Sequence, residues 1–126
     1  MENNKEIKIL VVDDEEVMRS LFTDLLSERG FKVSVANNGK EAIELIKETF
    51  FQVVILDMHM PLMNGVETLR TIRVMSPKTS IVMTDSFPDK FAEEALKEGA
   101  ISCIHKPFNI QEVIEVVNKA IENKET

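Results

Sequence analysis

The sequence has little of what marks membrane, secreted or nucleic-acid-binding proteins. Its one cysteine, Cys103, cannot form a disulfide within the chain, so a reducing, cytoplasmic setting is the default expectation. No apolar run approaches the roughly 20 residues that span a bilayer, and acidic residues interrupt the apolar run near the N-terminus, which argues against a signal peptide. Basic residues number 15 against 22 acidic ones, so this chain is not expected to bind nucleic acid or a membrane.

Repeats, low-complexity blocks and internal linkers are also missing. The chain has 126 residues, of which 44% are hydrophobic and 29% charged, as in an ordinary soluble globular protein. This length fits one domain with one hydrophobic core. We therefore expect a single domain over residues 1–126, with its folded core at about 6–122.

Strand-like and helix-like patterns alternate along the chain. Short β-branched or apolar runs predict strands at 7–12, 31–36, 51–56, 80–84 and 100–105. Apolar residues at helical spacing follow each run, and Gly30 and Gly99 stand where two of the helices should end. Asn109 and Glu112 have the spacing of a capping box at the start of the last helix.

The first predicted helix has an unusually wide apolar stripe. Its members recur every four residues in two adjacent rows: Val17, Met18, Leu21, Phe22, Leu25 and Leu26. Such a wide stripe is typical of an amphipathic helix. Repeated βα units with apolar strands predict an open, doubly wound α/β fold, in which helices cover both faces of a parallel sheet. Such sheets bind ligands beyond the carboxyl ends of their strands.

Polar residues stand at the carboxyl ends of four predicted strands. Asp13 and Asp14 follow the first strand, Asp57 the third, Thr84 the fourth and Lys106 the fifth. Because parallel strands end at one edge, these side chains should converge there. Three carboxylates would repel one another, and Mg²⁺, which prefers oxygen ligands, would relieve the repulsion. Thr84 and Lys106 suit phosphoryl oxygens, and Asp57 can attack phosphorus to become an acyl phosphate.

Four motifs at these strand ends carry a resemblance to a known family. They are "VVDDEE", "VVILDMHMPLMNG", "IVMT" and "IHKPF", in that order. Together they resemble the receiver domain of two-component response regulators, over about residues 6–122. The resemblance implies a flavodoxin-like, five-stranded parallel sheet of order 2-1-3-4-5 with five helices on both faces. It also implies Mg²⁺ as the cofactor.

The resemblance further implies a role for individual residues. Asp57 is similar to the phospho-acceptor of the family. Asp13 and Asp14 are similar to the acidic pair that holds Mg²⁺ together with Asp57, and the backbone carbonyl of His59 would join them. His59 is the first residue of "HMPLMNG", the loop that follows the third predicted strand.

On the other side of the implied site, Thr84 is similar to the switch hydroxyl and Lys106 to the lysine that pairs with the phosphoryl group. A cis peptide bond is implied between Lys106 and Pro107. The implied donor is a sensor histidine kinase or a histidine phosphotransfer protein. The implied target of the signal is a downstream protein or an output domain absent from this chain. The protein would be a switch that catalyses its own phosphorylation and dephosphorylation, rather than a conventional enzyme.

Asp85 departs from the family pattern, in which a small residue usually follows the switch threonine. We expect its carboxylate at the mouth of the site, where it would hinder anionic phospho-donors or change the hydrolysis rate of the phosphoryl group. Alternatively, it would pair with Lys106, or help Ser86 cap the fourth helix together with Asp89.

Cys103 departs as well, because similar domains usually carry Tyr or Phe there. A small thiol would weaken the coupling between the threonine and this position, or leave the switch to the fourth helix and its preceding loop, where Phe87 is the nearest aromatic residue. Nothing near Cys103 in the sequence would lower the pKa of its thiol, so packing rather than redox sensing is expected.

Other interpretations stay open at this stage. Taken singly, Asp13 or Asp14 can cap the first helix, Asp57 can open a loop, and Thr84 and Lys106 can be ordinary strand and surface residues. Three other functions compete. The first is an aspartate-nucleophile hydrolase like the haloacid dehalogenases, which have "DxD" at the nucleophile, whereas here His59 takes the place of the second Asp. The second is a receiver-like module that Asp85 prevents from being phosphorylated. The third is a flavodoxin-type FMN binder.

Overall fold

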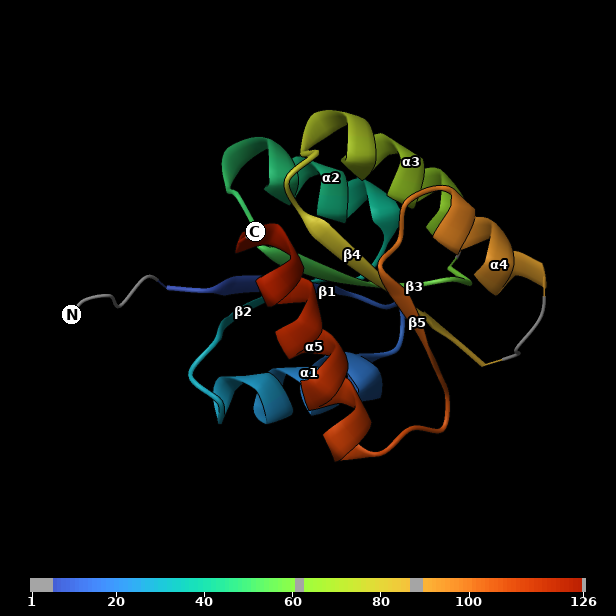
Figure 1. Ribbon diagram of the computed structural model, residues 1–126. Helices are drawn as coiled ribbons and strands as arrows, with labels where there is room; N and C mark the ends of the chain where they lie inside the picture. The colour runs from blue at the N-terminus through green and yellow to red at the C-terminus, as the bar shows by residue number, and fades with distance from the viewer. Residues whose placement is uncertain (1–5, 61–62, 87–89, 126) are drawn as a thin grey trace.

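The computed structural model describes residues 6–60, 63–86 and 90–125, in which strands and helices alternate (Figure 1). The strands are β1 (Lys8–Val12), β2 (Lys32–Ala36), β3 (Val53–Asp57), β4 (Ser80–Asp85) and β5 (Ser102–His105). The helices are α1 (Glu16–Ser27), α2 (Gly39–Glu48), α3 (Gly65–Met75), α4 (Lys90–Lys97) and α5 (Ile110–Glu125). None of these helices combines the length and apolar character needed to cross a membrane.

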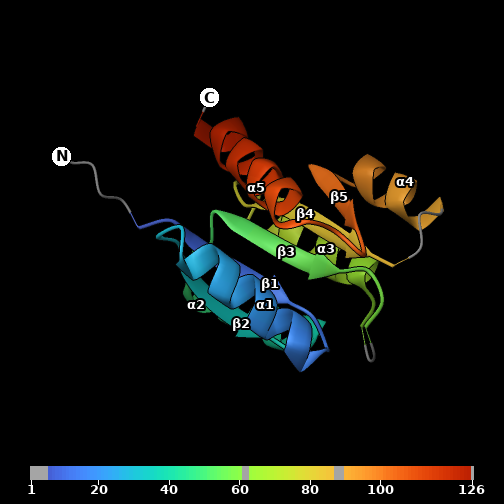
Figure 2. The ribbon, with the colours of Figure 1, turned by 90° about the horizontal axis from the view of Figure 1, so that it is seen from below.

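The described strands form one parallel sheet in the order β2-β1-β3-β4-β5. This confirms the predicted doubly wound fold and its strand order. Helices α1 and α5 cover one face of the sheet, and α2, α3 and α4 cover the other (Figures 1 and 2). The carboxyl ends of the strands therefore share one edge, as the sequence-based argument for the site requires.

Alternating side chains of the strands fill two apolar cores, one on each face. On β3, Val53 and Ile55 pack with α1 and α5, while Val54 and Leu56 pack with the other three helices. All four are at most 1% exposed. Because helices cover both faces, this strand is a continuous apolar run rather than an alternating one.

The apolar stripe of α1 is buried only in part. Along one row of the stripe, exposure falls steadily, from 77% at Val17 to 43% at Leu21 and 7% at Leu25. Residues four positions apart drift by about 40° around a helix. The row therefore turns away from the sheet toward the N-terminal end of α1, and the adjacent Phe22 and Leu26 are the fully buried members.

The helix boundaries agree with the signals in the sequence. Gly30 and Gly99 follow α1 and α4 with φ angles of +90° and +114°, a region that glycine enters without steric penalty. The side chain of Asn109 accepts a hydrogen bond of 2.7 Å from the backbone N–H of Glu112, which is one half of the predicted capping box.

Candidate functional site

Asp57 and Thr84 lie side by side at the carboxyl edge of the sheet. They are register partners at the ends of β3 and β4, and the backbone N–H of Met58 donates to the carbonyl of Thr84 at 2.9 Å. Directly opposed residues in a sheet point to the same face. Oγ1 of Thr84 is buried and makes no hydrogen bond within the part of the chain that the structure describes. The hydroxyl is therefore available to a group that binds beside Asp57.

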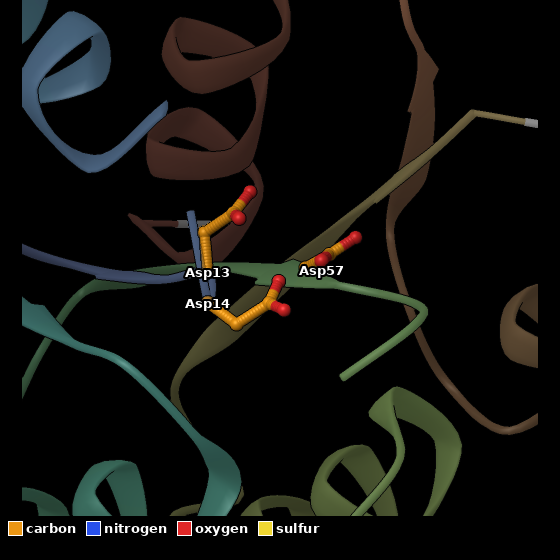
Figure 3. Close-up of side chains that lie close together, drawn as sticks. All are labelled: Asp13, Asp14 and Asp57. Atoms are coloured by element: carbon orange, nitrogen blue, oxygen red, sulfur yellow. The ribbon is translucent and has the colours of Figure 1, made fainter. Parts of the chain in front are cut away.

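Asp13 and Asp14 complete an acidic cluster with Asp57 (Figure 3). One carboxylate oxygen from each residue lies within 4.8 Å of the others, so one cation can contact them directly or through water. Asp13 and Asp57 are buried, and Asp14 is exposed. The interpretation of Asp13 or Asp14 as the cap of α1 is wrong, because the N-cap residue is Glu15; its backbone N–H donates to Oδ1 of Asp13 at 2.9 Å.

Lys106 brings a positive charge to the same cluster. Its Nζ atom lies 3.3 Å from Oδ2 of Asp13 and 3.6 Å from Oδ1 of Asp57, and its side chain is 15% exposed. Burial lowers the pKa of Lys106, but the carboxylates of Asp57 and Asp13 outweigh that effect, so its pKa is raised above the ordinary value. The Lys106–Pro107 peptide bond is cis, the geometry expected from the sequence.

The environment of Asp57 opposes its negative charge. Burial and the neighbouring charge of Asp13 raise the pKa of the Asp57 carboxyl to about 6, against the opposing pull of Lys106. When all three carboxylates are ionised, the single ammonium of Lys106 leaves two negative charges uncompensated. Oxygen-only donors with this charge fit a hard divalent cation such as Mg²⁺.

The N-terminus of α3 rests on the backbone that carries Asp57. The backbone N–H of Gly65 donates to the carbonyl of Met58 at 3.0 Å, and a Cβ atom on Gly65 would lie 2.5 Å from the carbonyl oxygen of Asp57. Asn64 and Glu67 form a full capping box at this helix start. We did not predict this support from the sequence, although the Asn-x-x-Glu spacing was a signal for it.

Asp85 does not lie at the mouth of the site, contrary to our expectation. It is the last residue of β4, and the alternation along that strand puts its side chain on the face of Met83, opposite Thr84. The side chain is fully buried, and Oδ1 lies 3.1 Å from Nε2 of His59. The N–H of Lys106 donates to the carbonyl of Asp85 at 2.7 Å, but this is a backbone bond of the β4–β5 ladder and does not test the alternative that the two side chains pair.

Two expectations near Asp85 fall outside the described residues. They are the capping of α4 with the help of Asp89 and the participation of Phe87 in the switch. Cys103 is half-buried on β5, next to Met83 in the ladder, and packs against the core on the α2–α4 face. This agrees with a packing role for the thiol.

Known proteins share this fold and sequence pattern. Residues 9–118 match the family model of the response regulator receiver domain. The chain is 40% identical over 107 residues to the transcriptional regulatory protein CpxR homolog of Haemophilus influenzae, covering 85% of this chain and 47% of the relative. It is 35% identical over 114 residues to the chemotaxis protein CheY of Thermotoga maritima, covering 89% of this chain and 95% of the relative.

A solved structure supports the same assignment. The crystal structure of a response regulator receiver domain protein from Clostridium thermocellum matches with a TM-score of 0.89 and 33% identity, over 94% of this chain and 97% of that one. The chain spans about half the length of the CpxR homolog and nearly all of the CheY relative. The family match includes the whole acidic cluster, Thr84 and Lys106. The chain belongs to the family of response regulator receiver domains.

Proposed function

We propose that this receiver domain accepts a phosphoryl group on Asp57 with the help of Mg²⁺. The observation that carries the proposal is the arrangement around this carboxylate. Asp13 and Asp14 lie within 4.8 Å, the ammonium of Lys106 lies 3.6 Å away, and the buried hydroxyl of Thr84 stands beside it. A binding site for both a divalent cation and a phosphoryl group needs these components.

Asp13, Asp14, Asp57 and the backbone carbonyl of His59 would hold the Mg²⁺ ion. When bound, the ion offsets the charge of the cluster and of the incoming phosphoryl oxygens. A carboxylate oxygen of Asp57 attacks phosphorus of a phosphohistidine while the phosphorus–nitrogen bond breaks. The electron pair of that bond leaves with the imidazole nitrogen, and the product is an acyl phosphate on Asp57. The donor would be a sensor histidine kinase or a histidine phosphotransfer protein.

Lys106 and Thr84 would hold the new group after transfer. Lys106 compensates Asp57 and Asp13 before phosphorylation, and afterwards its ammonium can pair with a phosphoryl oxygen instead. The Thr84 hydroxyl can donate to another oxygen. The phosphoryl group adds about −1.5 to −2 charges at this edge of the sheet. The domain catalyses its own modification in this scheme and acts as a switch rather than as an enzyme that turns over an external substrate.

Helix α4 is the element best suited to respond. It has eight residues and is the next helix along the chain after β4, the strand whose carboxyl end carries Thr84. Among the side chains described on it, Ala92 and Ala95 are the buried ones, and these two small side chains bury little apolar surface. The face formed by α4, β5 and α5 would pass the signal to a downstream protein or to an output domain. The CpxR homolog is longer than its matched region, which covers 47% of it.

Intact mass after incubation with acetyl phosphate and Mg²⁺ tests this function. We expect one added phosphoryl group, which is absent in Asp57→Asn and absent with a metal chelator. Beryllofluoride binding serves as a second test when a short lifetime hides the adduct. If neither the adduct nor beryllofluoride binding is seen with wild-type protein, the proposal is wrong. Continued turnover of a phosphate ester, with many phosphates released per protein molecule, would favour the aspartate-nucleophile hydrolase instead.

A further inference from the structure

A contact on the face of the sheet opposite the phosphorylation site joins the segment that leaves β3 to the end of β4. Nε2 of His59, in the segment that leaves β3, lies 3.1 Å from Oδ1 of Asp85, the last residue of β4. The His59 side chain is 49% exposed, whereas that of Asp85 is fully buried. This contact therefore connects a surface residue near Asp57 to a fixed point in the sheet.

The burial of Asp85 makes the contact strong enough to position a neighbour. A buried carboxylate loses its hydration and needs hydrogen-bond donors in return. An imidazole N–H that donates to it forms a charge-assisted hydrogen bond, which is shorter and stronger than a neutral one. The backbone of Asp85 is itself held by β5, because its carbonyl accepts from the N–H of Lys106 at 2.7 Å. His59 is thus attached to a rigid partner.

The backbone of His59 belongs to the site, although its imidazole does not. Its N–H donates to Oδ1 of Asp57 at 3.5 Å, and its carbonyl is the proposed fourth protein ligand of Mg²⁺. Anchoring the imidazole restricts where the Cα atom and these main-chain groups of His59 can lie, because only the two side-chain torsions separate the ring from the backbone. One residue therefore links a buried carboxylate on the α4 face to the phosphorylation site on the other face.

We propose that Asp85 is a positioning residue that acts through His59 to hold the backbone of residues 57–59 in the geometry that binds Mg²⁺. This inference rests on the proposed function. Asp85 touches neither the metal nor the phosphoryl group in this scheme. Removing a partner that orients a metal ligand typically weakens metal binding by about 10- to 100-fold. Because Asp85 acts on a main-chain group through one side chain, we expect the lower end, about tenfold.

Titration of the unphosphorylated chain with MgCl₂, followed by backbone amide NMR shifts, measures this effect without any phosphoryl transfer. We expect Asp85→Ala and His59→Ala each to weaken Mg²⁺ binding about tenfold, and the double variant to lose no more than either alone, since both remove one contact. Asp85→Asn keeps an oxygen that can accept from Nε2 and should recover most of the affinity. A merely stabilising contact would lower stability in all these variants and leave Mg²⁺ affinity unchanged.

Ser80→Ala is the matched control. It removes a buried hydrogen bond of 3.0 Å from Ser80 Oγ to the carbonyl of Ala120, at the other end of β4 from Asp85. We expect it to lower the urea midpoint but to leave Mg²⁺ affinity as in wild type. If Ser80→Ala weakens Mg²⁺ binding as much as Asp85→Ala does, general loss of stability explains the effect and the inference is wrong.

The outcomes separate this inference from the proposed function. If wild-type protein binds no Mg²⁺, the proposed function fails, and the inference falls with it. If wild-type protein binds Mg²⁺ and both alanine variants bind it equally well, the function stands and the positioning role is overturned. If Asp85→Ala does not fold, His59→Ala decides alone, because its imidazole is half-exposed and its removal leaves β4 unchanged. Unchanged affinity in that variant also overturns the inference.

Discussion

Replacing the proposed phospho-acceptor should make the metal-free protein more stable. The pKa of the Asp57 carboxyl is raised from its ordinary value of 3.8 to about 6, mainly by burial and then by the charge of Asp13. Each pKa unit corresponds to 1.36 kcal/mol between the two protonation states, so the ionised carboxylate costs the folded state about 3 kcal/mol. Asp57→Asn removes this cost, because asparagine has a similar shape and no charge.

The gain in stability should depend on pH in a defined direction. A group whose folded pKa is raised by burial binds its proton more tightly in the folded state than in the unfolded state. Below about pH 4 both states of the wild type are protonated at Asp57, and the variant has little advantage. As the pH rises from about 4 to about 6, the unfolded state ionises first and the wild type loses stability. Above about pH 6 the full difference is present.

Urea unfolding followed by circular dichroism measures this difference, because the chain has no Trp and no Tyr to report by fluorescence. With a typical urea slope of about 1–3 kcal/mol per molar, 3 kcal/mol shifts the midpoint by roughly 1–3 M near neutral pH in the presence of a chelator. Added Mg²⁺ should narrow the gap, because it stabilises the folded wild type. Asp24→Asn, at an exposed acid of α1, is the matched control and should change stability by less than about 0.5 kcal/mol.

Two results would refute this reasoning. One is an Asp57→Asn variant that is no more stable than wild type near neutral pH with chelator. The other is a gain of the same size at about pH 4 as at about pH 7, because the penalty on a buried charge must disappear when the carboxyl is protonated. Either result would mean that the folded protein does not resist ionisation of this carboxyl.

Three further substitutions test other parts of the structure, and two of them have a matched control variant. Lys106→Met should strengthen Mg²⁺ binding and weaken beryllofluoride binding, since its ammonium competes with the cation for the same carboxylates; weaker Mg²⁺ binding in NMR titrations would contradict this. Gly65→Ala should lower the urea midpoint by the equivalent of about 1–3 kcal/mol. It should also impair phosphorylation, because the added Cβ would collide with the backbone of Asp57 and Met58. Gly30→Ala, whose Cβ meets nothing within 4 Å, should cost about 1–2 kcal/mol from its positive φ alone and leave phosphorylation intact. Arg70→Ala should speed hydrogen exchange in α4, because Arg70 pairs with Glu98 at 2.8 Å and with Glu94 at 3.3 Å. Lys47→Ala, which removes an ion pair within α2, should leave hydrogen exchange in α4 unchanged.

The fold was predictable because each local signal agreed with the parallel sheet. β-branched runs, helical stripes and the terminating Gly30 and Gly99 placed the strands within two residues of their observed bounds. The sequence was least reliable at the strand ends. Asp57 and Asp85 are polar and so looked like loop residues, yet the ladder continues through both of them. Backbone hydrogen bonds, which do not depend on the side chain, decide where a strand ends.

The site was predictable to the extent that it consists of strand ends. Residues at the carboxyl ends of parallel strands must converge, so the acidic cluster and Lys106 followed from position alone. The contact between His59 and Asp85 could not be predicted in this way. It joins residues that are far apart in the sequence, and it involves Asp85, by which β4 extends one residue beyond the predicted strand 80–84.

The place of Asp85 in β4 decides between two explanations of its effect, one through its charge at the phosphoryl site and one through its contact with His59. If its carboxylate faced the phosphoryl site, Asp85→Asn would speed phosphorylation by the anionic donor acetyl phosphate even at saturating Mg²⁺, because a repelling charge would be gone. Its side chain instead lies on the face of Met83. Burial, Asp13 and Asp14 raise the pKa of Asp57, and Lys106 and the backbone of His59 lower it, so Asp85 is not among the causes of the shift. We therefore expect Asp85→Asn to leave that rate unchanged at saturating Mg²⁺. A faster rate would show that Asp85 acts on the donor through its charge and not on the backbone through His59.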